Sequence, residues 1–553
     1  MSAAGGEPLL RLRGASFRYP GRAEPALMAA DFAVRPGEYV LVAGPTGSGK
    51  STLLKVLAGL LPGSSAGRLD GERHIAAGIR CGVVFQSPDD QIFSNRVFDE
   101  IAFGLRNAGV AESLLPARIE KTLEAVGLAG RADADPATLS GGQKQRLVLA
   151  AALALEPSVL VLDEPLSQLD PQGARDVRSV LERLRSEQGL ALVLAEHRLE
   201  NGLGEALSRV AAVAGGRVTL DLEVSTPGHR GRIAETLLEL GLRVPLAVQA
   251  AKLVPEAWAA GVRDEAALLE WARAHTGSQR QGLPVPHEKE RASGAVGPVV
   301  LEAERVSFAY RQGFALKDLS FSIHARERVA LMGANGSGKS TLLALLAGLL
   351  APSEGSIRSS GRRGYTFQNP DAMLIGATAL DEAAFGPRHA LKLGRVQAEA
   401  QARAALQVLG LAERESEAPL ALSRGQRLRL AAAAVMSLDP SVLLLDEPTT
   451  GQDRVHIERL LAALESSERA VLFSTHDVDL ACAWADRVVV LMEGRVVASA
   501  LPERVFADEA LLQKAGLRRP TALALSEKLN MPACRSAAEL ARMLNAGQRE
   551  GES

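Results

Sequence analysis

The chain of 553 residues contains a long internal repeat, which limits its possible folds more than any other feature of the sequence. The segment GPTGSGKSTLLKVLAGLLPG at 44–63 returns as GANGSGKSTLLALLAGLLAP at 333–352. Further along each half, LVLDEP at 160–165 returns as LLLDEP at 443–448. The spacing between matched residues shortens along the chain, which indicates loops of different length within one architecture. The repeat therefore predicts two copies of the same domain.

Each copy continues beyond its last motif into a similar segment. GLRVPLAVQAAKL at 241–253 is similar to GLRRPTALALSEKL at 516–529, so the repeated unit includes a helical C-terminal extension. The stretch at 276–298 is rich in Gly, Pro, Ser and charged residues and has no apolar period, as is typical of a flexible linker. We expect a first domain, its extension, a linker, a second domain and its extension at 8–222, 223–275, 276–298, 299–502 and 503–546.

Composition excludes several classes of protein. The chain has 63 Lys and Arg against 65 Asp and Glu, a net charge of −2, which gives no general attraction to nucleic acid. Apolar stretches such as 147–155 and 430–436 are shorter than the about 18–20 residues that span a bilayer. Because Cys81, Cys482 and Cys534 are scattered and the N-terminus lacks a secretory apolar core, we expect a reducing cytoplasm.

The local pattern predicts an α/β fold. YVLVAG before Pro45 and RVALMG before Ala334 have the composition of buried strands, and each runs into a glycine-rich turn and an apolar helix. Apolar residues spaced three or four apart at 111–127 and 396–409 predict a helical subdomain in each copy. The expected fold is two P-loop domains of the α/β class, each with a helical subdomain and a helical extension.

The motif G-x-x-x-x-G-K-[ST] occurs at 44–51 and again at 333–340, each time between a predicted strand and a helix. Its glycines let backbone N–H groups wrap phosphates, the lysine neutralises β and γ charge, and the serine hydroxyl ligates Mg²⁺. The motif predicts two ATP sites. The nucleotide-binding residues expected from it are Gly44, Thr46, Gly47, Ser48, Gly49, Lys50, Ser51 and Thr52, with Gly333, Asn335, Gly336, Ser337, Gly338, Lys339, Ser340 and Thr341 in the second copy.

An Asp-Glu pair ends an apolar run in each copy. Asp163 and Asp446 would lie at the carboxyl edge of a buried strand, where an aspartate can hold Mg²⁺ directly or through water. Glu164 and Glu447 follow at once and are suited to polarise the water that attacks the γ-phosphate. We predict the aspartates as metal ligands and the glutamates as general bases.

The segments LSGGQ at 139–143 and LSRGQ at 422–426 complete a pattern that closely resembles the ATP-binding cassette (ABC) family. The resemblance implies that two cassettes pair head to tail, so that the signature of one closes over ATP held by the other. We expect this pairing within one chain, because the linker raises the effective concentration of the second cassette. The first P-loop would then meet Ser423, Gly425 and Gln426, and the second would meet Ser140, Gly141, Gly142 and Gln143.

The resemblance assigns four further pairs of residues. These are the adenine-stacking Tyr19 and Tyr310, the Mg²⁺-sensing and catalytic Gln86 and Gln368, the D-loop Asp170 and Asp453, and the switch histidines His197 and His476. Arg424 replaces the first glycine of the second signature, next to the ATP of the first site. Because both copies keep all other motif residues, we expect two unequal sites and no inactive one.

The segment FQSPDDQIFSNRVFDEIAFGL at 85–105 resembles the ATPases of energy-coupling factor (ECF) importers, as do the paired extensions. The second copy keeps FQNPD at 367–371 and DEAAFG at 381–386 but differs at 372–374. The resemblance implies an ATPase on the cytoplasmic face of the cell membrane that powers uptake of a vitamin, a vitamin precursor or a transition-metal ion. Its partners would be a transmembrane scaffold and a substrate-binding membrane subunit, and the ATPase itself would contact neither the transported molecule nor nucleic acid.

Two alternatives share the same catalytic residues. One is the tandem ATPase of an importer fed by an extracytoplasmic binding protein, against which only the DDQIF segment at 89–93 argues. The other is a soluble tandem ABC protein acting on ribosomes or DNA. Such proteins tend to have long charged helical linkers, whereas 276–298 is short and rich in Pro and Gly.

Overall fold

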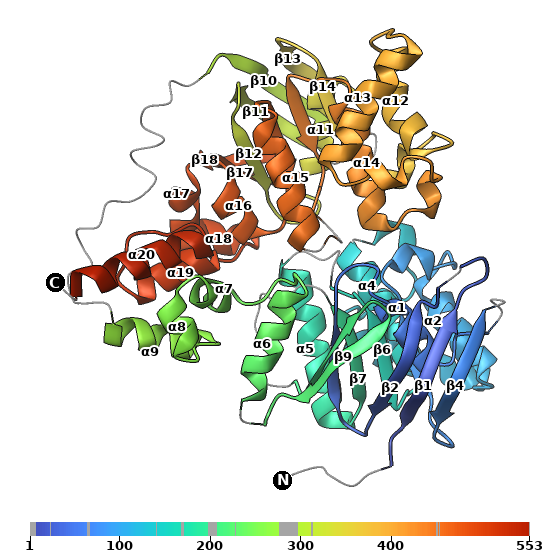
Figure 1. Cartoon of the computed structure of the whole chain (residues 1–553). Helices are drawn as coiled ribbons and strands as arrows, with labels where there is room; N and C mark the ends of the chain where they lie inside the picture. Colours follow the sequence, from blue (N-terminus) through green and yellow to red (C-terminus); the bar gives the residue numbers. More distant parts are fainter. Residues whose placement is uncertain are drawn as a thin grey trace. The chain divides into compact units, whose positions relative to one another are not determined.

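The computed structural model describes residues 7–22, 24–63, 67–139, 141–166, 171–196, 207–226, 228–275, 297–310, 313, 315–449, 452 and 454–551. Most of the linker predicted at 276–298 lies outside these ranges. The chain forms two compact units, 1–245 and 246–553 (Figure 1). Each unit contains the α/β domain that the repeat predicts, so the α/β fold class with two P-loop domains is confirmed.

The first unit holds two sheets. A three-stranded antiparallel sheet has the order β2-β1-β4, and a six-stranded sheet has the order β5-β6-β7-β3-β8-β9, in which only β9 is antiparallel to its neighbour. Their bounds are β1 Leu10–Arg18, β2 Leu27–Val34, β3 Tyr39–Ala43, β4 Arg68–Ile75, β5 Cys81–Val84, β6 Val159–Asp163, β7 Ala191–Glu196, β8 Arg209–Ala214 and β9 Arg217–Glu223.

Three inner strands of the six-stranded sheet are buried along their whole length and are apolar except at their ends. Every residue of β3, β6 and β7 is buried, as expected for parallel strands that are covered on both faces. Helix α1 (Lys50–Leu57) packs between the two sheets, where Leu53, Leu54 and Val56 join one apolar core with side chains from both. This core fixes the start of α1, and with it the P-loop, against the carboxyl end of β3.

Helices α2 (Val97–Asn107), α3 (Leu115–Ala125) and α4 (Gly141–Ala154) form the helical subdomain of the first unit. The stripe predicted at 111–127 is confirmed, because Leu115, Ile119, Leu123 and Val126 are all buried. The remaining helices are α5 (Pro171–Gln188) and α6 (His229–Glu239), and the 3-10 turns are η1 (Pro88–Asp90), η2 (Glu112–Leu114) and η3 (Pro136–Thr138).

The second unit repeats this design with sheets of order β11-β10-β13 and β14-β15-β16-β12-β17-β18. The bounds are β10 Val299–Ala309, β11 Ala315–His324, β12 Arg328–Met332, β13 Glu354–Ser359, β14 Arg363–Thr366, β15 Val442–Leu445, β16 Ala470–Ser474, β17 Arg487–Met492 and β18 Arg495–Ala500. The helices of its cassette are α11 (Lys339–Ala347), α12 (Ala379–His389), α13 (Arg395–Val408), α14 (Arg424–Met436), α15 (Arg454–Ser466) and α16 (Val478–Trp484), with turns η4 Pro370–Ala372, η5 Ala412–Arg414 and η6 Pro419–Ala421.

Strand β12 shows how this domain is layered. Val329 and Leu331 face the core shared with α11 and the small sheet, whereas Ala330 and Met332 face the core shared with α12 to α16. Successive side chains of a strand point to opposite faces, so the apolar run 329–332 supplies two cores at once. The sheet is therefore the middle of three layers.

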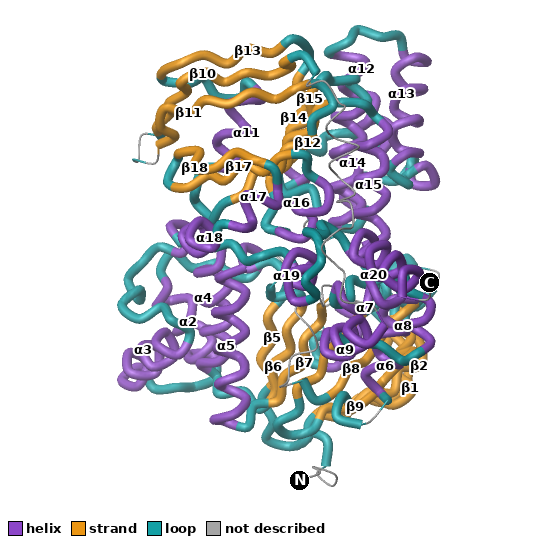
Figure 2. The backbone as a smooth tube through the Cα atoms, turned by 90° about the vertical axis from the view of Figure 1, so that its left-hand side faces the viewer, coloured by secondary structure: helices purple, strands orange, loops and turns teal. Residues whose placement is uncertain are grey.

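The two helical extensions share one apolar core inside the second unit. Helices α7 (Leu246–Lys252), α8 (Pro255–Ala259) and α9 (Glu265–His275) precede the second cassette, whereas α17 (Pro502–Ala507), α18 (Glu509–Ala515), α19 (Thr521–Lys528) and α20 (Ala537–Gly551) follow it. Buried side chains of α7 to α9 pack with those of α19 and α20, as Figure 2 shows for the helices themselves. The segment predicted as one extension at 223–275 is thus divided, because α6 belongs to the first unit.

The second extension is fastened to helix α16. The Arg535 side chain is 1% exposed and donates from Nε to Cys482 O at 2.6 Å and from Nη2 to Ala485 O. These are carbonyls at the carboxyl end of α16, where a cation is favoured by both hydrogen bonding and the helix dipole. At the other end of α16, Asp479 accepts a hydrogen bond from Thr521 N at 2.6 Å.

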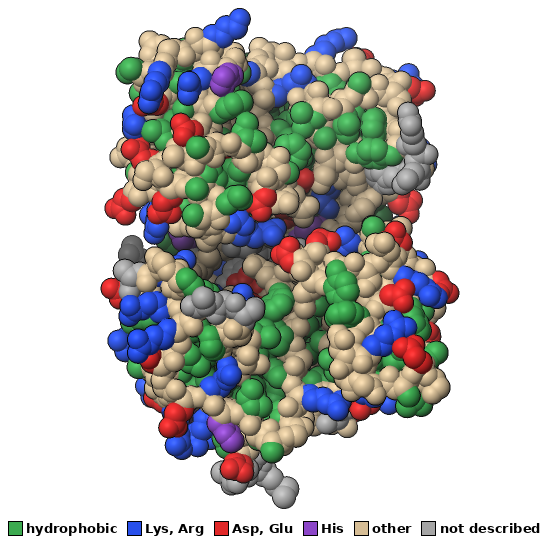
Figure 3. All heavy atoms as spheres, turned by 90° about the vertical axis from the view of Figure 1, so that its right-hand side faces the viewer, with side chains coloured by type: hydrophobic (Ala, Val, Ile, Leu, Met, Phe, Trp, Pro, Cys, Tyr) green, Lys and Arg blue, Asp and Glu red, His purple; other side chains and the backbone are tan. Residues whose placement is uncertain are grey.

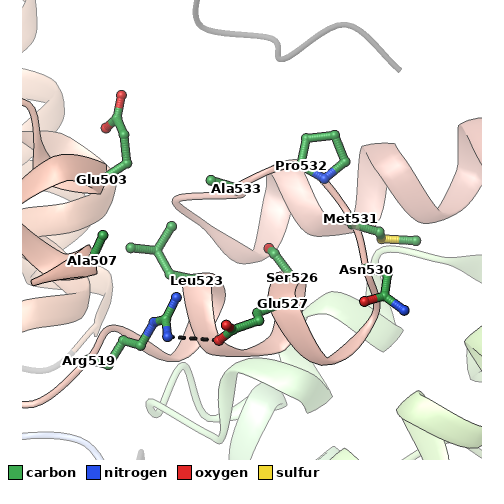
Figure 4. Close-up of a pocket in the computed structure, with 10 residues that line it drawn as sticks. All are labelled: Glu503, Ala507, Arg519, Leu523, Ser526, Glu527, Asn530, Met531, Pro532 and Ala533. Carbon is green, nitrogen blue, oxygen red and sulfur yellow. Dashed lines mark ion pairs between the residues drawn. The ribbon is translucent and has the colours of Figure 1, made fainter. Parts of the chain in front are cut away.

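The extension also leaves a cavity of about 510 Å³ between α17, α19 and the loop that follows α19 (Figure 4). Arg519 and Glu527 form an ion pair of 2.7 Å at its wall. In the part of the chain that the structure describes, no helix is long and apolar enough to cross a membrane.

Because the core is shared, we predict that a destabilising substitution in α20 also destabilises α7 to α9, the helices that precede the second cassette. Leu544→Ala removes a fully buried side chain, so we expect a local loss of about 2–5 kcal/mol. Hydrogen exchange should accelerate in 246–275 as well as in α20. Leu253→Ala, at a side chain that is 50% exposed, is the control and should change stability by less than about 0.5 kcal/mol. Faster exchange in α20 alone would contradict a shared core.

Candidate nucleotide-binding sites

The first P-loop connects β3 to α1 and depends on close backbone approach. A Cβ on Gly44 would lie 2.3 Å from Val213 O, and one on Gly49 would lie 2.7 Å from Ala26 O. Gly49 also has φ +107°, a conformation that L side chains rarely adopt. Glycine is therefore required at both positions, because the loop packs directly against the neighbouring backbone.

The second P-loop, between β12 and α11, has the same construction. A Cβ on Gly333 would lie 2.2 Å from Leu491 O, and Gly338 has φ +107°. In both loops a buried serine hydroxyl, on Ser48 or Ser337, has no hydrogen-bond partner among the described residues. A phosphate-bearing ligand fits a glycine loop that allows close backbone approach and carries an unsatisfied buried hydroxyl.

The P-loop lysines are buried and curl back onto their own loops. Lys50 Nζ donates to Gly44 O at 2.7 Å and to Pro45 O at 3.0 Å. Lys339 Nζ repeats this with Gly333 O at 2.8 Å and Ala334 O at 3.1 Å. An ammonium group held inside the cradle places a positive charge where bound phosphates would carry negative charge.

The aspartates predicted as metal ligands lie at the strand ends beside these loops. Burial raises the pKa of Asp163, while a hydrogen bond with Ser51 lowers it. Burial likewise raises the pKa of Asp446, and hydrogen bonds with Ser474 and Ser340 oppose the rise. Each site thus joins an aspartate to the P-loop serine, which is the oxygen donor set that suits Mg²⁺. A bound Mg²⁺ would neutralise charge on the β- and γ-phosphate oxygens.

The glutamates that follow have a strained backbone. Glu164 has φ 49° and Glu447 has φ 51°, in the left-handed region that residues other than glycine seldom occupy. At the first site Gln86 Nε2 donates to Glu164 Oε2 at 2.8 Å, and Lys50 Nζ lies 4.0 Å from Glu164 Oε1. At the second site His476 Nε2 lies 2.9 Å from Glu447 Oε1.

The second signature begins helix α14 with a capping box. Ser423 Oγ accepts from Gln426 N at 3.3 Å, and Ser423 N donates to Gln426 Oε1 at 2.8 Å. Gly425 is buried in the first turn. The Ser and Gln of the signature therefore orient each other and the N-terminus of α14, which is an anion-binding position.

Comparison with known proteins agrees with this geometry. The family model described as ABC transporter matches residues 27–167 and 316–450. A Methanosarcina mazei protein, provisionally named an ABC transporter ATP-binding protein, is 36% identical, and the match covers 96% of this chain and 95% of that protein. The chain belongs to the ABC transporter family. It is an ABC ATPase, whose ATP hydrolysis is coupled to transport.

Two further comparisons cover most of this chain. Bacillus subtilis YkoD, provisionally named an HMP/thiamine import ATP-binding protein, is 34% identical, with 93% of this chain and 95% of YkoD covered. A solved structure described as a model of ribosome-bound archaeal Pelota and ABCE1 has a TM-score of 0.60 and 22% identity, covering 88% of this chain and 79% of that one. At that identity the second likeness shows the tandem fold alone.

The structure describes some, but not all, of the remaining residues that the family resemblance predicts for the two sites. Tyr19 Oη lies 3.3 Å from Thr52 Oγ1 and its ring packs edge-on against Phe17, while Tyr310 is 44% exposed and packs edge-on against Phe308. Gln368 is exposed, whereas Gln86 is half-buried and donates a hydrogen bond to Glu164. Ser140, Asp170, His197 and Asp453 lie outside the described residues, whereas Gly141, Gly142 and Gln143 form the first turn of α4.

The structure adds a link that sequence reasoning missed. In each ABC cassette an acidic residue of the turn after the Q-loop glutamine pairs with a basic residue one position beyond the signature, Asp89 with Lys144 and Asp371 with Arg427, both at 2.6 Å. The acid and the base recur at matched positions in both copies. This recurrence in the sequence could have indicated that the two residues form an ion pair. The Q-loop turn and the signature helix are thereby tied together within each cassette.

The glutamate geometry predicts the effect of removing one carboxylate charge. Glu164→Gln and Glu447→Gln should each lower ATP turnover, and the double variant should lower it by about 100-fold or more, with ATP binding retained. Turnover should be measured by phosphate release and binding by fluorescent-nucleotide titration. The matched control is Glu493→Gln, because Glu493 is exposed and also has a positive φ of 47°. Normal turnover in the double variant would remove the glutamates from the reaction.

Proposed function

We propose that this chain is the ATP-hydrolysing subunit of an ECF-type importer of a micronutrient, namely a vitamin, a vitamin precursor or a transition-metal ion. The observation that carries the proposal is an exposed apolar surface beside the Q-loop turn of each cassette. The relation to YkoD over almost the whole of both chains supports micronutrient uptake. The proposed location is the cytoplasmic face of the cell membrane.

The first apolar surface consists of Phe93 and Phe103. These rings are 63% and 50% exposed and meet edge to face with centroids 4.7 Å apart. Phe93 N and Ser94 N both donate to the buried Glu100 carboxylate, which holds the loop against α2. Two exposed aromatic rings on a rigid support suit an apolar helix of a membrane subunit.

The second surface has Ile375 and Phe385, which are 68% and 44% exposed. Glu382 accepts from Ile375 N and Gly376 N at 2.7 and 2.6 Å, as Glu100 does in the first cassette. Figure 3 shows that hydrophobic side chains also reach the surface in groups on the face that it draws. In both docking surfaces a buried glutamate holds the loop, but the exposed apolar side chains differ. This difference fits a scaffold that presents a different helix to each cassette.

Gln91 of the DDQIF segment bonds within its own cassette, which the sequence did not reveal. Gln91 Oε1 accepts from Phe85 N at 2.7 Å, and its Nε2 donates to Val83 O at 3.3 Å. This amide extends strand β5 toward Gln86 and is engaged within the cassette. We therefore assign docking to Phe93 and Phe103 and a supporting role to Gln91.

Within this proposal the residue roles follow the family pattern. Glu164 and Glu447 would accept the proton of the attacking water while the bond between the γ-phosphorus and ADP breaks. Asp163 and Asp446 with Ser51 and Ser340 would hold Mg²⁺. The signatures would complete the opposite sites in a head-to-tail pair, with Arg424 making the first site unlike the second. The transported molecule would bind only to the membrane subunits.

Affinity purification from mild-detergent membranes tests the proposal. A scaffold and a small membrane protein should be recovered with the tagged chain, without an extracytoplasmic binding protein. Recovery of a binding-protein-dependent permease would replace the ECF assignment, and recovery of ribosomes or DNA would replace transport itself.

Substitution of the apolar surface sharpens this test. Phe93→Asp with Phe103→Asp should weaken scaffold binding by about 2 kcal/mol or more, roughly 30-fold, because buried interface aromatics dominate binding energy. Basal ATP turnover should stay unchanged. Leu114→Asp is the matched control, since Leu114 is 59% exposed in the same subdomain. Equal scaffold recovery with the double variant would contradict docking at this surface.

A further inference from the structure

A buried hydroxyl joins the two acidic residues of the second site. Ser474, the last residue of β16, is 0% exposed. Its Oγ donates to Asp446 Oδ1 at 2.6 Å and accepts from Glu447 N at 2.9 Å. One side chain therefore holds both the carboxylate of the predicted metal ligand and the backbone of the predicted base.

The first site lacks this hydroxyl. The sequence is LAEH at 194–197 where the second copy has FSTH at 473–476, so Ala195 of β7 occupies the position of Ser474. The register of β6 and β7 agrees, because Ala195 pairs with Asp163. Here Glu164 N donates to the Ala195 carbonyl at 3.0 Å. The glutamate N–H is satisfied at both sites, but among the described residues only Asp446 receives a side-chain donor from the neighbouring strand.

Orientation of a carboxylate affects its use as a ligand. A carboxylate with one oxygen held by a buried donor loses little rotational freedom when it takes a cation, and outer-shell donors of this kind raise metal affinity about 10- to 100-fold. Asp446 also forms a hydrogen bond with Ser340 of the P-loop. At the first site the Asp163 carboxylate is held by Ser51, which the cation itself would engage.

We propose that Ser474 is a positioning residue that orients Asp446 for the divalent cation bound with ATP, and that its absence at Ala195 makes the second site the tighter cation site. The inference rests on the proposed residue roles, because it needs Asp446 to hold the cation. It assigns the inequality of the sites to a residue inside one cassette, independently of Arg424 in the second signature.

Mn²⁺ provides a probe that reports binding without turnover. Full-length Lys50→Ala, with the first P-loop disabled, isolates the second site, and Mn²⁺ affinity in saturating ATP is measured by electron paramagnetic resonance. Adding Ser474→Ala should weaken Mn²⁺ binding by about tenfold or more, whereas ATP affinity without metal should change less than about threefold. The reciprocal arm adds Ala195→Ser to Lys339→Ala and should tighten Mn²⁺ binding at the first site.

The outcomes are distinguishable. Equal Mn²⁺ affinity with and without Ser474→Ala, in proteins with equal melting temperatures, overturns the inference and leaves the proposed function intact. Absence of Mn²⁺ binding to Lys50→Ala itself overturns both the inference and the assignment of Asp446. If Ser474→Ala fails to fold, the Ala195→Ser arm decides, and unchanged affinity there counts against the proposal.

Discussion

The structure of each cassette depends on the packing of the P-loop against the carboxyl ends of buried parallel strands. Gly44 and Gly333 lie so close to the carbonyls of Val213 and Leu491 that no side chain fits between them. This contact fixes the start of the following helix. It also places the lysine and serine of the loop near Asp163 or Asp446, at the end of a strand that is separated from the P-loop strand by one other strand of the sheet. The ATP-hydrolysing chemistry thus follows from backbone packing, which requires both faces of the sheet to be covered.

The two nucleotide sites share this frame but differ in how the acidic residues are held. Gln86 reaches Glu164 at the first site, whereas His476 reaches Glu447 at the second. Ser474 adds a donor that the first site lacks. Because the two P-loops have nearly the same sequence and construction, the differences lie in side chains around the acidic residues. The two copies of one domain thus hold the same acidic residues through different outer contacts.

The extensions show how the repeat also builds structure that neither copy has alone. Helices α7 to α9 each bury too few apolar residues to form a core by themselves, and they complete one with α19 and α20. Arg535 then joins that core to α16 by capping its carbonyls from a fully buried position. A guanidinium with several carbonyl acceptors can be buried where a lysine would leave its charge less well satisfied. The segment between the cassettes therefore contributes to the fold of the second unit.

The sequence by itself determined the two α/β domains, the P-loops, the Asp-Glu pairs and the helical stripe at 115–126, because each is encoded by local spacing: glycine where backbone is crowded, an acid where an apolar strand ends, a leucine every third or fourth residue. Only the tertiary structure decided that Gln91 extends β5, that Asp89 pairs with Lys144, that α7 packs with α20 and that Ser474 holds Asp446. These contacts join residues from different elements, and strand order and side-chain direction bring them together. Neither is written in the spacing of residues along the chain, since β3 lies between β7 and β8 only once the sheet has assembled.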